Sequence, residues 1–380
     1  MKRPFLPGNT IGVMGGGQLG RMFAIAARRM GYRVHVFTPD ENSPASQFAD
    51  FTSRADYNDE DAVRRFARNV KLITFEFENI PAGTIAWCAH HAELRPSGNA
   101  VEIAQHRLRE KTWLADNGIP LPEFRPVRSV GDLEAAVDQI GRAAILKTAS
   151  WGYDGKGQQS ISSRDLEEVW AARAGDELVL ERAIDFEKEI SVIVARDPKG
   201  NIAAFPVAEN IHRNHILDVS IVPADIPKTI ADEAVKLANA IAEKLNLVGL
   251  LAVEMFVEKN GGVLVNELAP RPHNSGHWSI EGCVTSQFEQ HVRAVCGLPL
   301  GATELLRPTA MANLLGDVWQ NGEPDWSAAL AVPNVRLHLY GKSEARPRRK
   351  MGHLTATANS AKEAAEVVRT ARKKLCKPKS

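Results

Sequence analysis

The stretch GLLAVEMFVEKNGGVLVNEL, residues 249–268, reads as two apolar strands joined by Asn260 and Gly261. Asn-Gly favours a two-residue type I′ turn, which fixes how the strands on either side pair. In that pairing Glu254 lies directly opposite Glu267. Two like charges that face each other across paired strands are destabilising unless something lies between them, and oxygen ligands alone favour Mg²⁺. The hairpin therefore predicts a metal site with Glu254 and Glu267 as ligands.

Two neighbouring features bear on this predicted metal site. Asn266 precedes Glu267 and is placed to add an oxygen ligand. The same pairing puts Phe256 and Val265 on the face of the two carboxylates, which speaks against the alternative of a solvated strand pair with tolerated repulsion. Metal binding is the favoured interpretation, and the solvated face stays open.

The loop APRPHNSGHW, residues 269–278, follows the hairpin directly and is dense in groups that bind anions. Arg271 suits bidentate recognition of a carboxylate or a phosphate. A single histidine is usually a structural donor, but the combination found here favours a substrate loop. A second basic cluster, RPRRKMGH at residues 346–353, is either part of a substrate site or a solvated turn.

A glycine cluster, WGYDGKGQ at residues 151–158, follows a predicted strand that ends near Lys147. Its backbone N–H groups are able to fold over phosphates, and Lys147 and Lys156 would add positive charge. The cluster lacks the Gly-Lys-Ser/Thr ending of a P-loop, which excludes a Walker-type site. A plain flexible hairpin tip is the alternative to a phosphate-covering flap.

The N-terminal hundred residues alternate between strand and helix. GGGQLG at residues 15–20 lies between a predicted strand over 10–14 and a predicted helix over 19–30, and further strands are predicted over 32–37 and 71–77. This alternation predicts a parallel, doubly wound sheet. The glycines have three interpretations: a dinucleotide fingerprint, a site for a phosphate-bearing substrate at the helix N-terminus, or a tight packing turn.

Composition limits the class of protein. The 380 residues are 44% hydrophobic and 24% charged, with a net charge of +1, which gives no electrostatic case for a nucleic acid or membrane partner. No apolar run approaches the roughly 20 residues needed to span a bilayer. The four cysteines are widely spaced, as in reduced thiols. We expect a cytoplasmic protein.

The fold class that follows is mixed, with α/β and α+β regions. A single helix over about 100–117 ends at the breaker cluster GIPLP. We predict a doubly wound domain over 1–108, a small flap domain over 109–184, a larger metal-binding domain over 185–300, and a C-terminal domain over 301–380 that completes the substrate cleft.

These motifs, in this order, resemble the ATP-grasp superfamily, and within it they are most similar to the N5-carboxyaminoimidazole ribonucleotide synthetases of purine biosynthesis. The resemblance spans nearly the whole chain. It is carried by GGGQLGRM from Gly15, FEFEN from Phe75, GYDGKGQ from Gly152, NELAPRPHNSGHW from Asn266 and RRKMGH from Arg348.

The resemblance implies roles for individual residues. The expected ATP-binding residues include phosphate contacts, an adenine hinge, and ribose contacts; they are Arg107, Lys147, Gly152, Tyr153, Asp154, Gly155, Lys156, Gly157, Gln158, Glu181, Arg182, Ala183, Ile184, Glu189, His212, Asn266 and Glu267. The expected catalytic residues around bicarbonate are Tyr153, Lys156, Arg271 and Lys350. The expected ribonucleotide-binding residues are Gln18, Leu19, Glu76, Asn79, His273, Asn274, Ser275, Lys342 and Arg349.

The implied reaction uses ATP and bicarbonate to carboxylate the amine of aminoimidazole ribonucleotide, through carboxyphosphate, giving ADP and phosphate. Mg²⁺ is the expected metal, with Mn²⁺ as a substitute, and a homodimer is expected from the resemblance alone. The rivals are formate-dependent glycinamide ribonucleotide transformylase, biotin carboxylase, a nicotinamide-dependent oxidoreductase that uses the first glycine loop, and a non-catalytic nucleotide-binding regulator.

Overall fold

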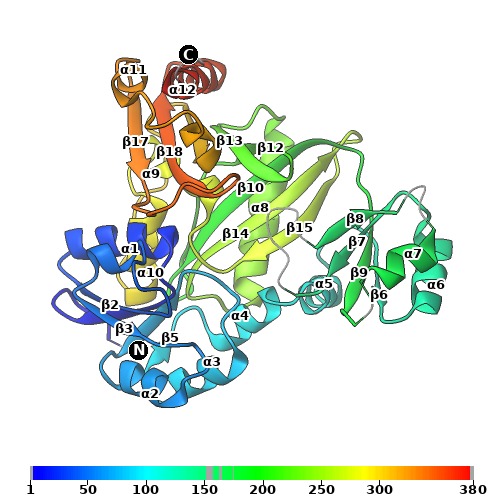
Figure 1. The fold of residues 1–380 in the computed structure, drawn as a ribbon, viewed down its shortest axis with the longest axis horizontal. Coiled ribbons are helices and arrows are strands. Elements are labelled where there is room, and N and C mark those ends of the chain that lie inside the picture. The colour runs from blue at the N-terminus through cyan, green and yellow to red at the C-terminus, as the bar shows by residue number, and fades with distance from the viewer. Residues whose placement is uncertain (1–2, 151–156, 162–164, 174, 377–380) are drawn as a thin grey trace.

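The computed structural model describes residues 3–150, 157–161, 165–173 and 175–376, and it contains three β-sheets. The first belongs to the N-terminal region, the second to a small region that stands apart at the right of Figure 1, and the third extends through the rest of the chain. The flap residues 152–156 of the predicted nucleotide site lie outside the described residues.

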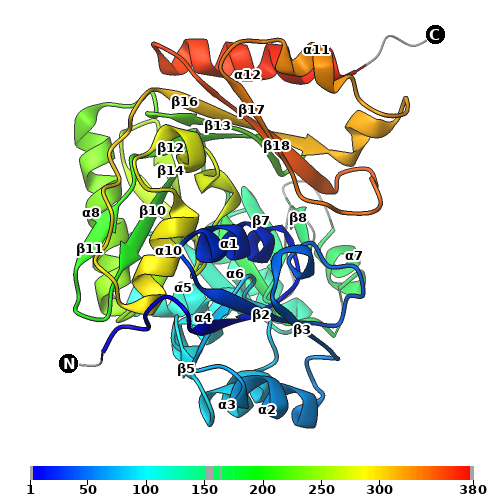
Figure 2. The same ribbon diagram turned by 90° about the vertical axis from the view of Figure 1, so that its left-hand side faces the viewer.

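The N-terminal sheet is parallel, with the order β3-β2-β1-β4-β5, which confirms the predicted doubly wound region. One face packs against helices α2 and α3, and the other against α1, which lies beside α10 from the third region (Figure 2). The elements are β1 (Thr10–Met14), α1 (Gln18–Arg29), β2 (Arg33–Thr38), β3 (Phe51–Arg54), α2 (Glu60–Arg68), β4 (Leu72–Phe75), α3 (Ala82–Ala89), β5 (Glu93–Leu94) and α10 (Gln287–Cys296).

The single helix predicted over 100–117 is wrong, because the chain forms two helices, α4 (Gly98–Ala104) and α5 (Arg107–Asp116). His106 is the N-cap of α5, and its ring accepts a hydrogen bond from the backbone of Arg109. The backbone N–H of Arg107 donates to the carbonyl of Ala149 at 2.7 Å. The break between the two helices places Arg107 at the start of α5, beside the end of the strand Ala144–Thr148.

The small sheet is antiparallel, with the order β6-β9-β7-β8, and it packs against α6 and α7 around an apolar core of its own. Lys147 and Glu181 come from adjacent strands of this sheet, β7 and β9. The elements are β6 (Phe124–Val127), α6 (Val130–Ile140), β7 (Ala144–Thr148), β8 (Gln158–Ser160), α7 (Leu166–Ala171) and β9 (Leu178–Arg182).

The third sheet has nine strands and runs from β15 at one edge to β17 at the other. Strand β13 pairs with β16, so the predicted regions 185–300 and 301–380 share one sheet. Helix α8 covers one part of the sheet, and α11 and α12 cover the C-terminal part. The division into four domains stays a prediction.

The bounds of these elements follow the chain. They are β10 (Phe186–Arg196), β11 (Ile202–Ala204), β12 (Ala208–Arg213), β13 (Ile216–Val222), α8 (Lys228–Lys244), β14 (Gly249–Glu258), β15 (Val263–Ala269), α9 (Ser279–Gly282), β16 (Thr309–Leu315), α11 (Trp326–Leu330), β17 (Val335–Leu339), β18 (Lys350–Thr357) and α12 (Ala361–Leu375).

Strands β14 and β15 form the predicted hairpin, but its turn differs from the two-residue type. Gly261 N–H donates to the Glu258 carbonyl at 2.8 Å, and Glu258 N–H donates to the Gly262 carbonyl at 2.8 Å, which closes a three-residue loop over 259–261. Gly261 has φ +87°, a conformation that glycine adopts without steric cost. In the pairs next to the loop, each residue of β14 therefore opposes the residue just before its predicted partner on β15.

A bulge further along β15 restores the predicted pairing. The register shifts at Asn266, and beyond it Glu254 is the partner of Glu267, as predicted. The shift also moves Val265 to the other face, where it is buried in the core beneath helix α8. The prediction that Val265 shares the face of the carboxylates is therefore wrong, whereas Phe256 does lie on that face, in the cleft described below.

Among the described helices, none is long and apolar enough to cross a membrane. All four cysteines are free thiols; Cys88, Cys283 and Cys296 are buried and Cys376 is exposed.

Candidate active site

A cleft of about 1030 Å³ lies between the three sheets, and both carboxylates of the hairpin line it. Most of the described residues predicted for the site reach this cleft. They are Gln18, Leu19, Glu76, Asn79, Arg107, Lys147, Gly157, Gln158, Glu189, His212, Glu254, Asn266, Glu267, Arg271, His273, Asn274 and Lys350. Seven predicted residues lie outside its lining: Glu181, Arg182, Ala183, Ile184, Ser275, Lys342 and Arg349.

The bulge at Asn266 decides which way the carboxylates point. In the register near the turn, Asn266 would oppose Glu254, and Glu267 would oppose Val253, which is fully buried in the core. One extra residue moves Glu267 back to the cleft face, because side chains alternate between the faces of a strand. The side-chain oxygen of Asn266 is buried and has no protein partner.

Helix α5 holds the bulged strand in place. Lys111 Nζ donates to the carbonyl of Asn266 at 3.0 Å, and a carboxylate oxygen of Glu110 accepts from the backbone N–H of Leu268 at 2.5 Å. Neither side chain was predicted for the site. Lys111 is fully buried, and no spacing pattern in the sequence links it to a strand that lies 155 residues away.

Two carboxyl groups beside Glu267 have strongly raised pKa values. Burial and the neighbouring charge of Glu267 raise the pKa of Glu254 to about 7. Burial and the same neighbour raise the pKa of Glu110 to about 8. This crowding of negative charge is what the sequence predicted for the hairpin, and Glu110 adds to it.

Positive charges face the carboxylates across the cleft. Arg107 Nη1 lies 3.8 Å from Glu267 Oε2. Lys147 Nζ donates to Glu181 at 2.8 Å, and Lys111 Nζ lies 3.2 Å from the same oxygen. Burial opposes ionisation of Glu181, but the nearby Lys111 and Lys147 lower its pKa to about 2. Glu181 thus lies behind the cleft wall and orients Lys147, the lysine that reaches the cleft.

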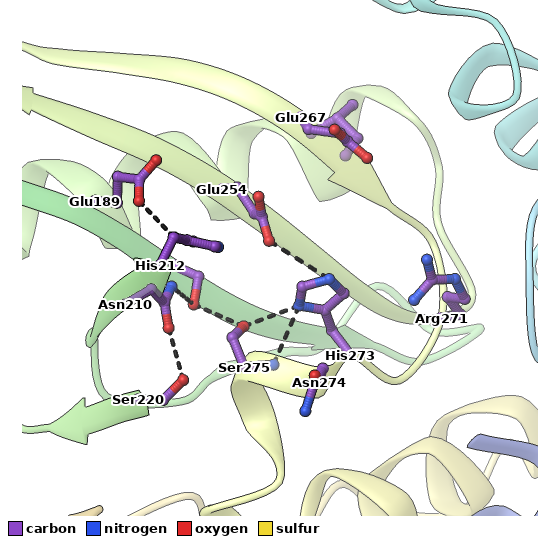
Figure 3. Close-up of polar contacts among 12 residues, drawn as sticks. Glu189, Asn210, His212, Ser220, Glu254, Glu267, Arg271, His273, Asn274 and Ser275 are labelled. Atoms are coloured by element: carbon purple, nitrogen blue, oxygen red, sulfur yellow. Dashed lines mark hydrogen bonds and ion pairs between the residues drawn. The ribbon is translucent and has the colours of Figure 1, made fainter. Parts of the chain in front are cut away.

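Side chains on β10, β12 and β14 form the opposite wall, where Glu189 contacts His212 (Figure 3). Burial opposes protonation of His212, but its hydrogen bond with Glu189 raises the pKa of the imidazole above its ordinary value. Phe186 stacks on Phe256, with ring centroids 4.9 Å apart, and both rings line the cleft. This aromatic pair was not predicted. Phe186 follows the predicted hinge closely in sequence, and Phe256 lies on the strand of the predicted metal ligand Glu254.

Arg271 is partly buried and bound to Glu78, a residue that was not predicted. Its Nη2 donates to Glu78 Oε1 at 2.9 Å, and its Nε donates to the other carboxylate oxygen. Burial opposes the charge of both groups, yet the pairing lowers the pKa of Glu78 and raises that of Arg271. Glu78 could have been identified from the FEFEN motif, because it lies between Glu76 and Asn79, which were both predicted for the site.

The first glycine loop is filled by a protein carboxylate. Glu76 accepts hydrogen bonds from the backbone N–H groups of Gly17 and, at 2.8 Å, Gly20 at the start of α1. A Cβ atom on Gly17 would lie only 2.6 Å from Glu76 Oε1. The glycines therefore permit close approach of Glu76, and this carboxylate takes the place of the phosphate that the dinucleotide interpretation required.

Two residues predicted for the ribonucleotide lie away from the cleft lining. Lys342 Nζ donates to the carbonyl of Lys350 at 2.7 Å, and Arg349 Nη1 donates to that of Glu344 at 2.9 Å. Both hold the loop between β17 and β18, from which Lys350 reaches the cleft. Of the basic cluster at 346–353, Lys350 is therefore the side chain that the structure brings to the site.

Three family models match the chain in sequence. A ribonucleotide synthetase preATP-grasp domain matches residues 8–105, an ATP-grasp domain matches residues 112–288, and a phosphoribosylaminoimidazole carboxylase C-terminal domain matches residues 309–367.

Curated relatives and solved structures agree with these models. The chain is 46% identical to N5-carboxyaminoimidazole ribonucleotide synthase of Bacillus subtilis (strain 168), over 93% of each protein. A crystal structure of an ADP complex of N5-carboxyaminoimidazole ribonucleotide synthetase superposes with a TM-score of 0.92 at 43% identity, covering 98% of each chain. The synthase from Aspergillus clavatus, in complex with ADP and 5-aminoimidazole ribonucleotide, superposes with a TM-score of 0.88 at 31% identity, covering 97% of this chain and 98% of that one.

Proposed function

The chain belongs to the family of N5-carboxyaminoimidazole ribonucleotide synthases, which are ATP-grasp ligases, and from this membership we propose how its cleft performs the reaction. The family's activity is the ATP-dependent carboxylation of 5-aminoimidazole ribonucleotide in purine biosynthesis, and it is the activity of this chain. The observation that carries the proposal is the pairing of Glu254 with Glu267 in a cleft that also holds Arg107 and Lys147.

ATP occupies the part of the cleft between the small sheet and strands β14 and β15. Arg107 and Lys147 contact its phosphates. The segment from Glu181 to Ile184 lies outside the cleft lining, and its role as the adenine hinge stays a prediction from the resemblance. Glu189 and His212 lie on the ribose side. The support for these roles is the position of the cationic groups opposite the hairpin and the buried Glu181, which orients Lys147.

The residues present fit a divalent metal ion. Glu254 and Glu267 face each other, and the side-chain oxygen of Asn266 is buried without a protein partner, so three oxygen groups are available. We expect Glu254 and Glu267 to hold Mg²⁺, with Mn²⁺ as a substitute and Asn266 as a further oxygen ligand. When bound, the ion supplies positive charge that neutralises phosphate oxygens.

In the first chemical step, a bicarbonate oxygen attacks the γ-phosphorus of ATP, and the bond from that phosphorus to the β–γ bridging oxygen breaks. ADP leaves, and carboxyphosphate is formed. Phosphoryl transfer requires mainly positioning and charge neutralisation, which Arg107 and Lys147 provide from this chain. No protein nucleophile takes part.

In the second step, the amine of 5-aminoimidazole ribonucleotide attacks the carboxyl carbon of carboxyphosphate or of CO₂ released from it. A C–N bond forms, phosphate leaves, and the amine loses a proton. These residues all line the cleft, and we assign Arg271 and Lys350 to bicarbonate and Gln18, Glu76 and Asn79 to the ribonucleotide. The predicted roles of Tyr153 and Lys156 lie outside the described residues, and homodimer assembly and a cytoplasmic location remain predictions.

A coupled phosphate-release assay tests the proposal. Release should depend on ATP, bicarbonate and Mg²⁺, and it should rise with aminoimidazole ribonucleotide but not with formate and glycinamide ribonucleotide. Glu267→Ala should lower the rate by about 100-fold or more, as expected for loss of transition-state charge stabilisation. Glu258→Ala, on the partner strand β14 of the same hairpin but outside the cleft, is the matched control. Full activity of Glu267→Ala would refute the metal assignment.

A further inference from the structure

A chain of hydrogen bonds runs from strand β13 to His273 in the loop after β15, and the His273 ring in turn contacts Glu254 (Figure 3). Ser220 donates its hydroxyl proton to Asn210 Oδ1 at 2.8 Å. The side-chain amide of Asn210 donates to Ser191 Oγ at 2.9 Å, and Ser191 donates to Ser275 Oγ at 2.8 Å. In each of these hydrogen bonds the donated hydrogen points along the chain toward His273.

The last link fixes which nitrogen of His273 carries hydrogen. Ser275 Oγ accepts from Ser191, and its own proton is directed to His273 Nδ1 at 2.9 Å. The backbone N–H of Ser275 donates to the same nitrogen at 3.3 Å. A backbone N–H is always a donor, so the direction at Nδ1 holds whichever way the Asn210 amide is turned.

His273 is thereby set as a neutral donor toward Glu254. With two donors directed at its Nδ1 lone pair, the neutral imidazole carries its proton on Nε2. His273 Nε2 lies 3.4 Å from Glu254 Oε1. Addition of a second proton at Nδ1 would set an N–H against the donors of Ser275, which the geometry disfavours.

The chain is buried along its length. The exposed fractions are 0% for Ser220, 5% for Asn210, 1% for Ser191 and 0% for Ser275. Water therefore has little access to replace a link, and a broken link leaves a buried polar group without a partner. Ser275 was predicted to bind the ribonucleotide, but its hydroxyl is engaged in this chain and lies outside the cleft lining.

We propose that His273 is a positioning residue that orients the Glu254 carboxylate for the divalent cation, and that the Ser220–Asn210–Ser191–Ser275 chain fixes the His273 ring with its hydrogen on Nε2, toward Glu254. Hydrogen bonds to a metal-binding carboxylate orient its oxygens. A neutral donor does so without placing a positive charge beside the cation. The proposal rests on the proposed function, in which Glu254 is a metal ligand.

The first test reads the tautomer directly. In ¹⁵N-histidine-labelled full-length protein, two-dimensional NMR distinguishes a ring nitrogen that carries hydrogen from one that does not. The His273 signals are identified among the 11 histidines by their loss in His273→Gln. We expect Nε2 protonated and Nδ1 unprotonated; a signal from protonated Nδ1 would overturn the proposal.

The second test uses two amides that mimic the two ring nitrogens. In His273→Gln the side-chain NH₂ is able to reach the Nε2 position, whereas in His273→Asn it reaches only the Nδ1 position. Binding of Mn²⁺ in the presence of ADP is measured from the EPR signal of the free ion. We expect His273→Asn to weaken Mn²⁺ binding by about 10-fold or more, the usual effect of losing a group that supports a metal ligand, and His273→Gln to weaken it by less than about 3-fold.

A third variant separates the two hypotheses. Glu254→Gln should weaken Mn²⁺ binding more than either histidine variant; if it leaves binding unchanged, the proposed metal site is wrong. If Glu254→Gln weakens binding but His273→Asn and His273→Gln behave alike, the metal site stands and the positioning role of His273 is refuted.

Discussion

Lys111 Nζ lies 3.0 Å from the carbonyl oxygen of Asn266, and this contact joins helix α5 to the bulged residue of strand β15. The same ammonium group lies 3.2 Å from Glu181 in the small sheet. One fully buried side chain therefore connects the strand of Glu267 to the strand that supports Lys147. The positions of Lys147 and Glu267 therefore depend on a common anchor.

Replacement of Lys111 should weaken Mg²⁺ binding by more than a general loss of stability would. In Lys111→Met, the apolar stem is retained but the Asn266 carbonyl loses its donor, at a cost of about 1–3 kcal/mol. Glu181 keeps Lys147 as a partner. We expect a several-fold rise in half-saturating Mg²⁺, measured by phosphate release, and a lower midpoint in urea unfolding.

Leu114→Ala is the matched control, since Leu114 is fully buried on the same helix but packs in the apolar core. It should cost about 2–5 kcal/mol of stability and leave half-saturating Mg²⁺ unchanged. Equal Mg²⁺ dependence in Lys111→Met and wild type would show that the anchor has no role at the site.

The raised pKa values of Glu110 and Glu254 predict that the metal-free protein loses stability as pH rises. The folded state keeps these carboxyls protonated up to about 8 and about 7, whereas the unfolded chain releases their protons near the ordinary value of 4.5. The folded state thus binds more protons between these limits, and its stability falls with rising pH. Thermal unfolding at about pH 7 and about pH 8 should show this trend, because the buried histidines, whose pKa values are lowered, influence stability only below their ordinary value of 6.5.

Added Mg²⁺ with ADP should restore stability more at the higher pH, because cation binding requires the ionised carboxylates. Glu110→Gln should flatten the pH dependence of the metal-free protein. A profile for this variant that matches wild type would mean that Glu110 is already ionised in the folded state.

The filled glycine loop predicts that the N-terminal region does not bind a dinucleotide. NADH fluorescence should not change on mixing with the protein. Glu76→Gln should destabilise the protein by about 1–3 kcal/mol, because an amide NH₂ then faces a backbone N–H of Gly17 or Gly20. Glu60→Gln, at the exposed start of α2, should change stability by less than about 0.5 kcal/mol. NADH binding by the wild-type protein would contradict this interpretation.

The pairing of Arg271 with Glu78 predicts a strong energetic coupling. Arg271→Met should cost about 1–3 kcal/mol, since Glu78 is left as a partly buried charge without its partner. Glu78→Gln in the same chain removes that charge and should recover part of the stability, measured by urea unfolding of the two single variants and the double variant. Strictly additive effects would show that the two side chains do not depend on each other.

The hairpin shows how much of the site can be predicted from the sequence alone. Asn260 and Gly261 correctly mark the turn, and the alternation of residues correctly identifies both strands. The predicted two-residue loop is wrong by one residue, and the bulge at Asn266 compensates for that error, so Glu254 still opposes Glu267. The bulge is held by Glu110 and Lys111, which come from a distant helix, and a local pattern contains no sign of such contacts.

The remaining differences at the site have the same origin. Arg271 has the chemistry of an anion-binding residue, but its partner Glu78 is 193 residues away in sequence and is identified only by folding. Ser275 and Lys342 were predicted to contact the ribonucleotide from their motifs, and the structure engages both in internal hydrogen bonds. Residue types indicated the chemistry of the cleft, whereas the tertiary structure determines which side chains reach it.

Strand β15 is the outermost strand of the nine-stranded sheet, a position from which an exposed backbone is able to recruit a strand of another chain. Here Val265 N–H donates to the carbonyl of Pro120, Lys111 binds the backbone of the bulged Asn266, and Glu110 binds that of Leu268 beyond it. The contacts that place Glu267 in the cleft also cover this edge. Separation of α5 from the sheet would expose it, and we expect such a partly unfolded form to aggregate by intermolecular strand pairing.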